Sequence, residues 1–475
     1  MVFALYIFDT INQIHGHGIY QKTNEGDDDF IMLALIGALT IIIMLILIMT
    51  KKMQTLLALI IVPIIGCLIA GFAGLISIED GTFSLTTMGG FITSGLQNIA
   101  PTGVMFIFAI LFFGILTDAG TFDPIISGIL KVVGKNPVKI CIGTVILACL
   151  VHLDGSGAVT FLIAIPAMLP LYEKLGMRKT TLATLVALGA GVMNMLPWGG
   201  PTIRAITALN TTIDDLYKPM IPAQVAGIAF IILVAVFLGK KEQKRLGDSL
   251  NQIELDNSTQ ATMEDNNLKR PKLFIFNIAL IILAVVVLIT SILPPAAVFM
   301  IATAIALIVN YPDIKIQKEL VDSHAKSALM MASMLFAAGS FIGIMQGSGM
   351  LSAMSTALVS LIPATLGKAL PAIIGVISMP LSLLFDPDSY YYGVMPVVAN
   401  AAGALGVDPL MIGRASIIGQ MTVGFPISPL TGATFLLTGL AGIDLGEHQK
   451  HTFVYAFLTS IVMLIVSIII GAISI

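Results

Sequence analysis

Leu153-Asp154-Gly155-Ser156-Gly157 interrupts a long apolar run, and Phe385-Asp386-Pro387-Asp388-Ser389 does the same in the second half of the chain. Each is followed, about 40 residues later, by another polar break: NMLPWGGPTIR at 194–204 and PISPLTGAT at 426–434. A carboxylate at mid-bilayer costs about 2.5–3.5 kcal/mol even on the mildest insertion scale. Gly and Pro break helices, which is tolerated in a membrane where the freed backbone groups face protein or a cavity. The stretches therefore predict a functional site inside the membrane.

The composition is that of a membrane protein. Of 475 residues, 57% are hydrophobic and 11% charged, whereas a soluble domain is about 25% charged. Several apolar runs reach the roughly 20 residues needed to cross a bilayer. We therefore predict an all-α polytopic membrane protein embedded in the lipid bilayer. The net charge of −3 gives no reason to expect a nucleic-acid partner. Cys67, Cys141 and Cys149 lie in apolar segments without CxxC spacing, which favours packing roles.

The chain divides into four parts. Residues 1–30 form a polar N-terminal extension that lacks the basic region and cleavage site of a signal peptide. We expect the natural start to be Met32, with a helix over 3–14 as the alternative. Residues 31–239 form a first repeat and residues 272–475 a second repeat. The basic, polar segment 240–271 between them is predicted to be a flexible cytoplasmic linker.

The two halves repeat each other in order. Gly114 and Gly343 are 229 residues apart (343 − 114), as are Pro197 and Pro426 (426 − 197). Asp154 and Asp386 are 232 apart (386 − 154). This spacing is larger than 229, which indicates a small insertion in the segment around these acids.

Charge predicts that the repeat is inverted. The loop 173–179 carries three basic residues and its counterpart 403–408 carries none, so equivalent loops lie on opposite faces. Both flanks of 140–172 are basic, which predicts a re-entrant hairpin. Each half should therefore contain about five crossing helices and one re-entrant hairpin, with helices broken at mid-membrane and both termini outside.

Inverted repeats with broken helices are typical of secondary transporters. A helix end carries about half an elementary charge, so N-terminal ends favour carboxylates, whereas carbonyl ends favour cations. Gly199 and Gly200 have no Cβ, which lets a ligand approach the backbone closely. Oxygen ligands suit Mg²⁺ or Ca²⁺.

Several side chains have two readings. Asp154 either binds a cation or proton or caps a hairpin arm. Arg204 either clamps a substrate carboxylate or pairs with an acid. His152 either titrates near neutral pH or is neutral and hydrogen-bonded. We expect Trp198 to pack against the hairpin rather than stack on a ligand.

The strings LDGSG, NMLPWGGPTIRA, FDPDSYYYGVMPV and GFPISPLTGATFLLTGLAG resemble the bacterial citrate–divalent-metal:proton symporter family, from about Met32 to the C-terminus. The resemblance implies uptake of citrate as a complex with Mg²⁺ or Ca²⁺, coupled to protons, across a bacterial cell membrane. It also implies no permanently bound cofactor, a homodimer, and separate scaffold and mobile transport domains. Relatives often carry a second acid at the position of Ser156.

In that superfamily the hairpin tips and helix breaks line the substrate site. The substrate-binding residues predicted here are Asp154, Gly155, Ser156, Gly157, Asn194, Pro197, Gly199, Gly200, Thr202, Arg204, Asp388, Ser389, Ser428, Pro429 and Thr431. The predicted metal ligands are Asp154, Asp386 and Asp388, whose metal arrives with the substrate. The predicted proton-coupling residues are Asp154, Asp386 and His152.

Three other functions fit parts of the pattern. A sodium-coupled di- or tricarboxylate carrier would use the same breaks. A cation/proton antiporter would use the acids but has no need of Arg204. A membrane-embedded hydrolase is disfavoured, because the chain has no His/Glu metal motif and no nucleophile elbow. We therefore predict a transporter and not an enzyme.

Overall fold

The computed structural model describes residues 25–76, 82–247, 267–361 and 364–474. All regular structure in these ranges is helical, and ten segments are long and apolar enough to cross a membrane. Lipid supplies no hydrogen-bond partners, so a chain of this composition satisfies its backbone as helices. The prediction of an all-α polytopic membrane protein is confirmed. Most of the predicted N-terminal extension, including the alternative helix 3–14, and residues 248–266 of the linker lie outside the described ranges.

The first repeat contains three long helices, a hairpin, a broken helix and a final long helix. They are α2 (Glu25–Met49), α3 (Thr55–Phe72), α4 (Leu85–Asp118), α5 (Asp123–Val133), α6 (Pro137–Val151), η1 (His152–Asp154), α7 (Gly157–Lys174), α8 (Lys179–Met193), α9 (Gly200–Leu209), α10 (Ile213–Leu216), η2 (Lys218–Met220) and α11 (Ile221–Leu246). The last helix thus continues past residue 239, the predicted end of the repeat.

The second repeat follows the same order. It contains η4 (Pro271–Leu273), α12 (Phe274–Thr290), α13 (Pro295–Asn310), α14 (Ile314–Gly347), α15 (Met350–Leu361), α16 (Ala364–Gly367), α17 (Leu370–Leu381), η5 (Ser389–Val394), α18 (Met395–Ala404), α19 (Pro409–Ile418), η6 (Gly419–Val423), η7 (Phe425–Ile427), α20 (Gly432–Ala441) and α21 (Leu445–Ile469). Each half therefore has five crossing units and one hairpin, as the sequence predicts.

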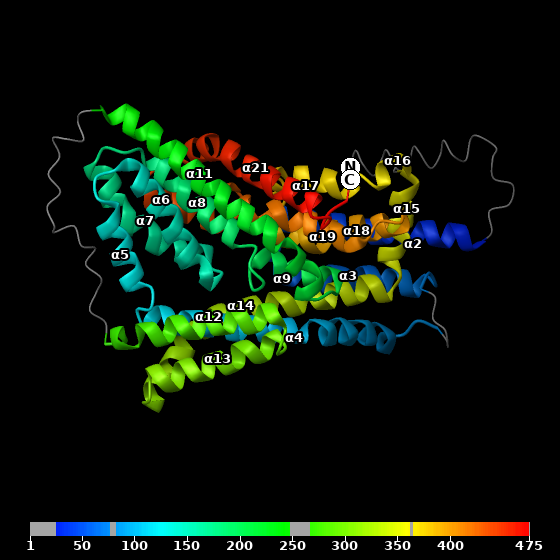
Figure 1. Ribbon diagram of the computed structural model, residues 1–475. Coiled ribbons are helices and arrows are strands. Elements are labelled where there is room, and N and C mark those ends of the chain that lie inside the picture. The colour runs from blue at the N-terminus through cyan, green and yellow to red at the C-terminus, as the bar shows by residue number, and fades with distance from the viewer. Residues whose placement is uncertain (1–24, 77–81, 248–266, 362–363, 475) are drawn as a thin grey trace.

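The helices α4 and α14 form the crossing on which the two repeats meet. Both have 34 residues, and they begin 229 positions apart (314 − 85). Gly95 packs so tightly on α14 that an added Cβ would collide with the Gly339 carbonyl oxygen. Gly114 in turn packs on the His324 ring. Early residues of one helix thus meet late residues of the other, so the helices are antiparallel, as inversion requires (Figure 1).

The helix α4 runs through Pro101 without interruption. Proline removes one hydrogen bond from the helical ladder. Here α4 packs along α14 on both sides of Pro101, at Gly95, Gly103 and Gly114, which holds the helix together despite that loss.

The second layer of the molecule holds the hairpins and broken helices. The hairpin arms are α6 and α7 in one repeat, and α17 with η5 and α18 in the other. The broken helix of the first repeat lies deepest, since every residue from 180 to 208 is buried. Figure 1 shows this layer on one side of α4 and α14. The first break therefore lies in the interior of the protein, away from lipid.

Basic residues gather at one end of the described structure. Arg245 pairs with Glu242 (2.6 Å) and donates to the Gly176 carbonyl (2.5 Å), which ties α11 to the loop after α7. Lys269 pairs with Asp123 at 3.0 Å. The positive-inside bias assigns this end to the cytoplasm.

The α4–α14 crossing generates a stability prediction. Substituting Gly95→Ala forces a methyl group against the α14 backbone, and overpacking of this kind costs about 1–3 kcal/mol. We expect the apparent melting temperature of the purified protein in detergent to fall. Gly90→Ala, on the same helix with open space around it, should leave that temperature unchanged or raise it slightly. Equal melting temperatures for the two variants would contradict the close crossing.

Candidate functional site

The tip of the first hairpin is a tight turn held by its own side chains. Gly155 has a left-handed φ of +73°, which favours glycine at this position. Asp154 Oδ1 accepts a hydrogen bond from the Ser156 amide at 2.8 Å. The Ser156 hydroxyl caps α7 by accepting from the Val159 amide at 3.4 Å. The hydrogen bond from Ser156 is the one contact of the Asp154 carboxylate within the described chain, and no described cation pairs with it.

His152 joins this tip to both helix breaks. Its Nδ1 hydrogen-bonds the Thr160 hydroxyl (2.8 Å) and its Nε2 hydrogen-bonds Asn194 Oδ1 (3.3 Å). Asn194 Nδ2 then donates to the Met421 carbonyl in the other repeat (2.6 Å). Of the two readings of His152, the structure has the hydrogen-bonded one. Its predicted part in proton coupling remains a prediction.

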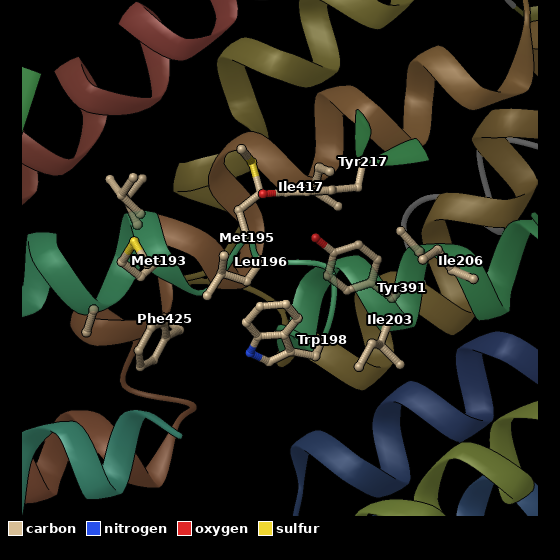
Figure 2. Packing of buried hydrophobic residues seen from close by; sticks show 14 of the residues in the cluster. Met193, Met195, Leu196, Trp198, Ile203, Ile206, Tyr217, Tyr391, Ile417 and Phe425 are labelled. Carbon is tan, nitrogen blue, oxygen red and sulfur yellow. The ribbon is translucent and has the colours of Figure 1, made fainter. Parts of the chain in front are cut away.

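The break between α8 and α9 is compact. Gly199 approaches the Asn194 carbonyl so closely that no Cβ fits there. Thr202 donates to the Met195 carbonyl across the break at 2.8 Å. Trp198 donates from Nε1 to the Leu153 carbonyl at 2.8 Å, so it packs against the hairpin, as expected. Figure 2 shows Trp198 and Tyr391 within the buried cluster around this break.

In the tip of the second hairpin the two acids have separate roles. Asp386 Oδ1 accepts from the amides of Asp388 and Ser389 (3.1 Å each), and its Oδ2 accepts from the Ser389 hydroxyl. Asp386 is thus a cap of the following turn. Asp388 instead accepts a hydrogen bond from Arg204 Nε at 2.7 Å, across the repeats. Both side chains of this ion pair are buried, at 8% and 13% exposure. Arg204 thus pairs with an acid in this structure, and its predicted part in substrate binding remains a prediction.

The break in the second repeat begins earlier than the predicted stretch 426–434. It includes Gln420 and Met421, and Met421 has a positive φ of 57°. The Gln420 side chain is fully buried, accepts hydrogen bonds from the Ser382 hydroxyl and the Met421 amide (3.1 Å), and donates to the Phe385 carbonyl (3.4 Å). Neither residue is among those predicted from the sequence. The signals that mark this position are Gly419 and a glutamine within a mainly apolar run.

The two repeats tie their breaks to their hairpins with hydrogen bonds to backbone carbonyls. Ser428 donates to the Ser382 carbonyl at 2.5 Å in the second repeat, and Trp198 donates to the Leu153 carbonyl in the first. Thr431 donates to the Phe425 carbonyl at 2.7 Å. Thr202 likewise donates to a backbone carbonyl of its own repeat, that of Met195. The hydroxyls of Thr202, Ser428 and Thr431 are therefore already donating to backbone carbonyls in this state.

Each tip also faces the restarted helix of the other repeat. Gly157 packs near Ala433 of α20, where an added Cβ would lie 3.7 Å from the Ala433 Cβ. The matching contact on the other side is the pair between Asp388 and Arg204, since Arg204 and Ala433 are 229 apart (433 − 204). One side of the site thus carries an ion pair where the other carries small side chains. This leaves a free carboxylate, Asp154, on the side without a cation.

The structure places the remaining predicted residues as follows. Pro197, Gly199 and Gly200 lie in the buried first break, whereas Pro429 is exposed in the second. Among the described residues there is no group of three or more His, Cys, Asp or Glu side chains placed to hold a metal. The substrate, metal and proton roles of all these residues remain predictions.

Comparison with known proteins identifies the family. The family described as Citrate transporter matches residues 28–419. The chain belongs to the citrate transporter family. The chain is 45% identical to a citrate transporter of Bacillus subtilis (strain 168), over 93% of this chain and 100% of the relative. It is 43% identical to the Mg(2+)/citrate complex secondary transporter of the same organism, over 94% of this chain and 100% of the relative.

The citrate transporter fold is also found in a solved structure. The YdaH transporter of Alcanivorax borkumensis, described as having an unusual topology, superposes with a TM-score of 0.61 at 14% identity. The match covers 93% of this chain and 98% of that one. The family confirms the prediction of a multi-pass bacterial membrane transporter rather than an enzyme.

The buried ion pair of this transporter generates a second prediction. Replacing Asp388→Asn leaves the Arg204 charge without its partner, and breaking a buried pair from one side costs about 3–5 kcal/mol. We expect a marked fall in the melting temperature. Removing both charges, in Arg204→Met with Asp388→Leu, should restore most of that temperature but not citrate uptake. A double variant as unstable as Asp388→Asn would contradict the pairing.

Proposed function

We propose that the protein takes up citrate as a complex with a divalent metal ion, in symport with protons. The single observation that carries the proposal is the placement of a cation at one hairpin tip and of a carboxylate without a cation at the other. The Arg204 guanidinium lies at the second tip, paired with Asp388, and the Asp154 carboxylate lies at the first tip, where no described cation pairs with it. A metal–citrate complex has the matching pair of features, carboxylates for Arg204 and a cation for Asp154.

The chemistry of citrate supports transport of a complex. Free citrate carries several negative charges that would have to lose water on entering the site, and burial of unpaired charge is strongly unfavourable. A bound divalent cation lowers the net charge to be dehydrated. Mg²⁺ and Ca²⁺ both prefer the oxygen ligands that citrate supplies. A curated relative named as a Mg(2+)/citrate complex secondary transporter supports the same reading.

Arg204 and Asp154 would take different parts in the cycle. Arg204 presents a planar fork of N–H donors that suits a carboxylate, so a substrate carboxylate competes with Asp388 for it. Asp154 has one oxygen committed to the Ser156 amide and one available for the metal or for a proton. Net positive charge moved with the substrate makes uptake respond to voltage, at about 2.3 kcal/mol per charge per 100 mV. We expect the protein to work as a homodimer.

Uptake of labelled citrate into proteoliposomes tests the function. The purified protein is assayed under an inward proton gradient with Mg²⁺, with Ca²⁺, with EDTA, and with a Na⁺ gradient in place of protons. We expect uptake that requires both a divalent cation and the proton gradient. Uptake that persists in EDTA and requires Na⁺ would instead assign the protein to the sodium-coupled carboxylate carriers.

The role of Asp154 has a matched control in the chain. Asp154→Asn keeps an oxygen that can accept from the Ser156 amide but loses the negative charge, so we expect uptake to be abolished at unchanged melting temperature. Asp408 caps α19 with the same geometry, since its Oδ1 accepts from the Leu410 amide at 3.0 Å, away from the tips. Asp408→Asn should transport normally. Near-normal uptake by Asp154→Asn would exclude the assigned role.

A further inference from the structure

Three consecutive tyrosines follow the second hairpin tip, and their hydroxyls differ in one respect. Tyr390, Tyr391 and Tyr392 form part of η5, a π-helical turn, and all are buried. The Tyr390 hydroxyl hydrogen-bonds the Ser416 hydroxyl at 2.8 Å, and Tyr391 donates to the Gln420 carbonyl at 2.9 Å. Tyr392 has no partner. Its hydroxyl is the one buried side-chain polar atom of the described residues that is left without a hydrogen bond.

An unpaired buried hydroxyl calls for an explanation. The large majority of buried polar side-chain atoms in proteins have a partner, and leaving one without a partner is unfavourable. The neighbouring tyrosines show that this turn can satisfy phenol groups when they serve the fold. The π-helical turn also indicates a functional role for this segment, because such turns occur often at functional sites.

The position of Tyr392 relates it to the candidate site. Tyr392 follows Asp388 by four residues, about one helical turn, which places both on the same face of the segment. Asp388 forms the ion pair with Arg204 that joins the two half-sites in the described chain. Tyr392 therefore belongs to the same helical turn as one member of this ion pair.

We propose that the Tyr392 hydroxyl is a substrate-binding group that donates a hydrogen bond to a citrate carboxylate held by Arg204. This inference rests on the proposed function. A phenol O–H and a guanidinium both donate hydrogen bonds, so together they favour an anionic carboxylate over a cation. The hydroxyl has no partner in the substrate-free protein because its partner is the substrate. Since Tyr392 is 1% exposed, the tip 386–389 has to move for the substrate to reach it.

Two phenylalanine substitutions in the full-length protein separate binding from stability. Binding of citrate in the presence of Mg²⁺ is measured by titration calorimetry on the purified protein, and the melting temperature is measured beside it. Tyr392→Phe removes a hydroxyl without a protein partner, so its melting temperature should stay unchanged or rise. Its Kd should increase by about 10- to 100-fold, the effect of one hydrogen bond to a charged group.

Tyr390→Phe is the matched control, because it removes a hydroxyl that is bonded within the fold. It should lower the melting temperature and leave the Kd unchanged. A Kd for Tyr392→Phe within twofold of the unchanged protein would overturn the inference. A fall in its melting temperature equal to that of Tyr390→Phe would also overturn it, since it would reveal a structural partner. Failure of the unchanged protein to bind citrate with any divalent cation would overturn the proposed function and this inference together.

Discussion

A helix that breaks inside a membrane frees backbone carbonyl and amide groups that lipid cannot satisfy, and the rest of this structure follows from how the protein satisfies them. Within each repeat, the hairpin tip is tied to the break, by Trp198 to the Leu153 carbonyl and by Ser428 to the Ser382 carbonyl. Across the repeats, Asn194 donates to the Met421 carbonyl. The first break thus supplies a hydrogen-bond donor to the second, from the other half of the chain. The polar centre and the inverted fold therefore depend on each other.

The two halves use the same framework with different charges. At the contact between a tip and the restarted helix of the other repeat, one side has Arg204 with Asp388 and the other has Ala433 with Gly157. This difference suits the proposed substrate, which has an anionic end and a cationic end, and for this reason we propose that it binds at the junction of the repeats.

Much of the fold could be predicted from the sequence, because lipid restricts where charge, Gly and Pro occur. The acids at 154, 386 and 388 and the glycines at 199 and 200 marked the tips and the first break directly. The positive-inside bias gave the inversion, and the antiparallel contact of Gly95 with Gly339 and Gly343 agrees with it.

Other features could not be predicted, because they depend on partners distant in sequence. The pairing of Arg204 with Asp388 spans 184 residues, and no local pattern distinguished it from a substrate clamp. Met421 adopts a positive φ without the usual glycine, supported by Gln420. Tyr392 could be told apart from Tyr390 and Tyr391 only by the absence of a partner among the described residues. Continuity of α4 through Pro101 required knowledge of its packing on α14.

The central claim is that metal–citrate binds between the tip of one repeat and the restarted helix of the other. Ala158 is exposed next to the first tip, so a cysteine at this position can report on binding there. The test uses Ala158→Cys in a protein whose Cys67, Cys141 and Cys149 are replaced by alanine. The measurement is the rate at which a thiol reagent labels Ala158→Cys with and without citrate and Mg²⁺. We predict that citrate with Mg²⁺ slows labelling and that either one alone does not. Labelling at one rate under all conditions would contradict binding at this junction.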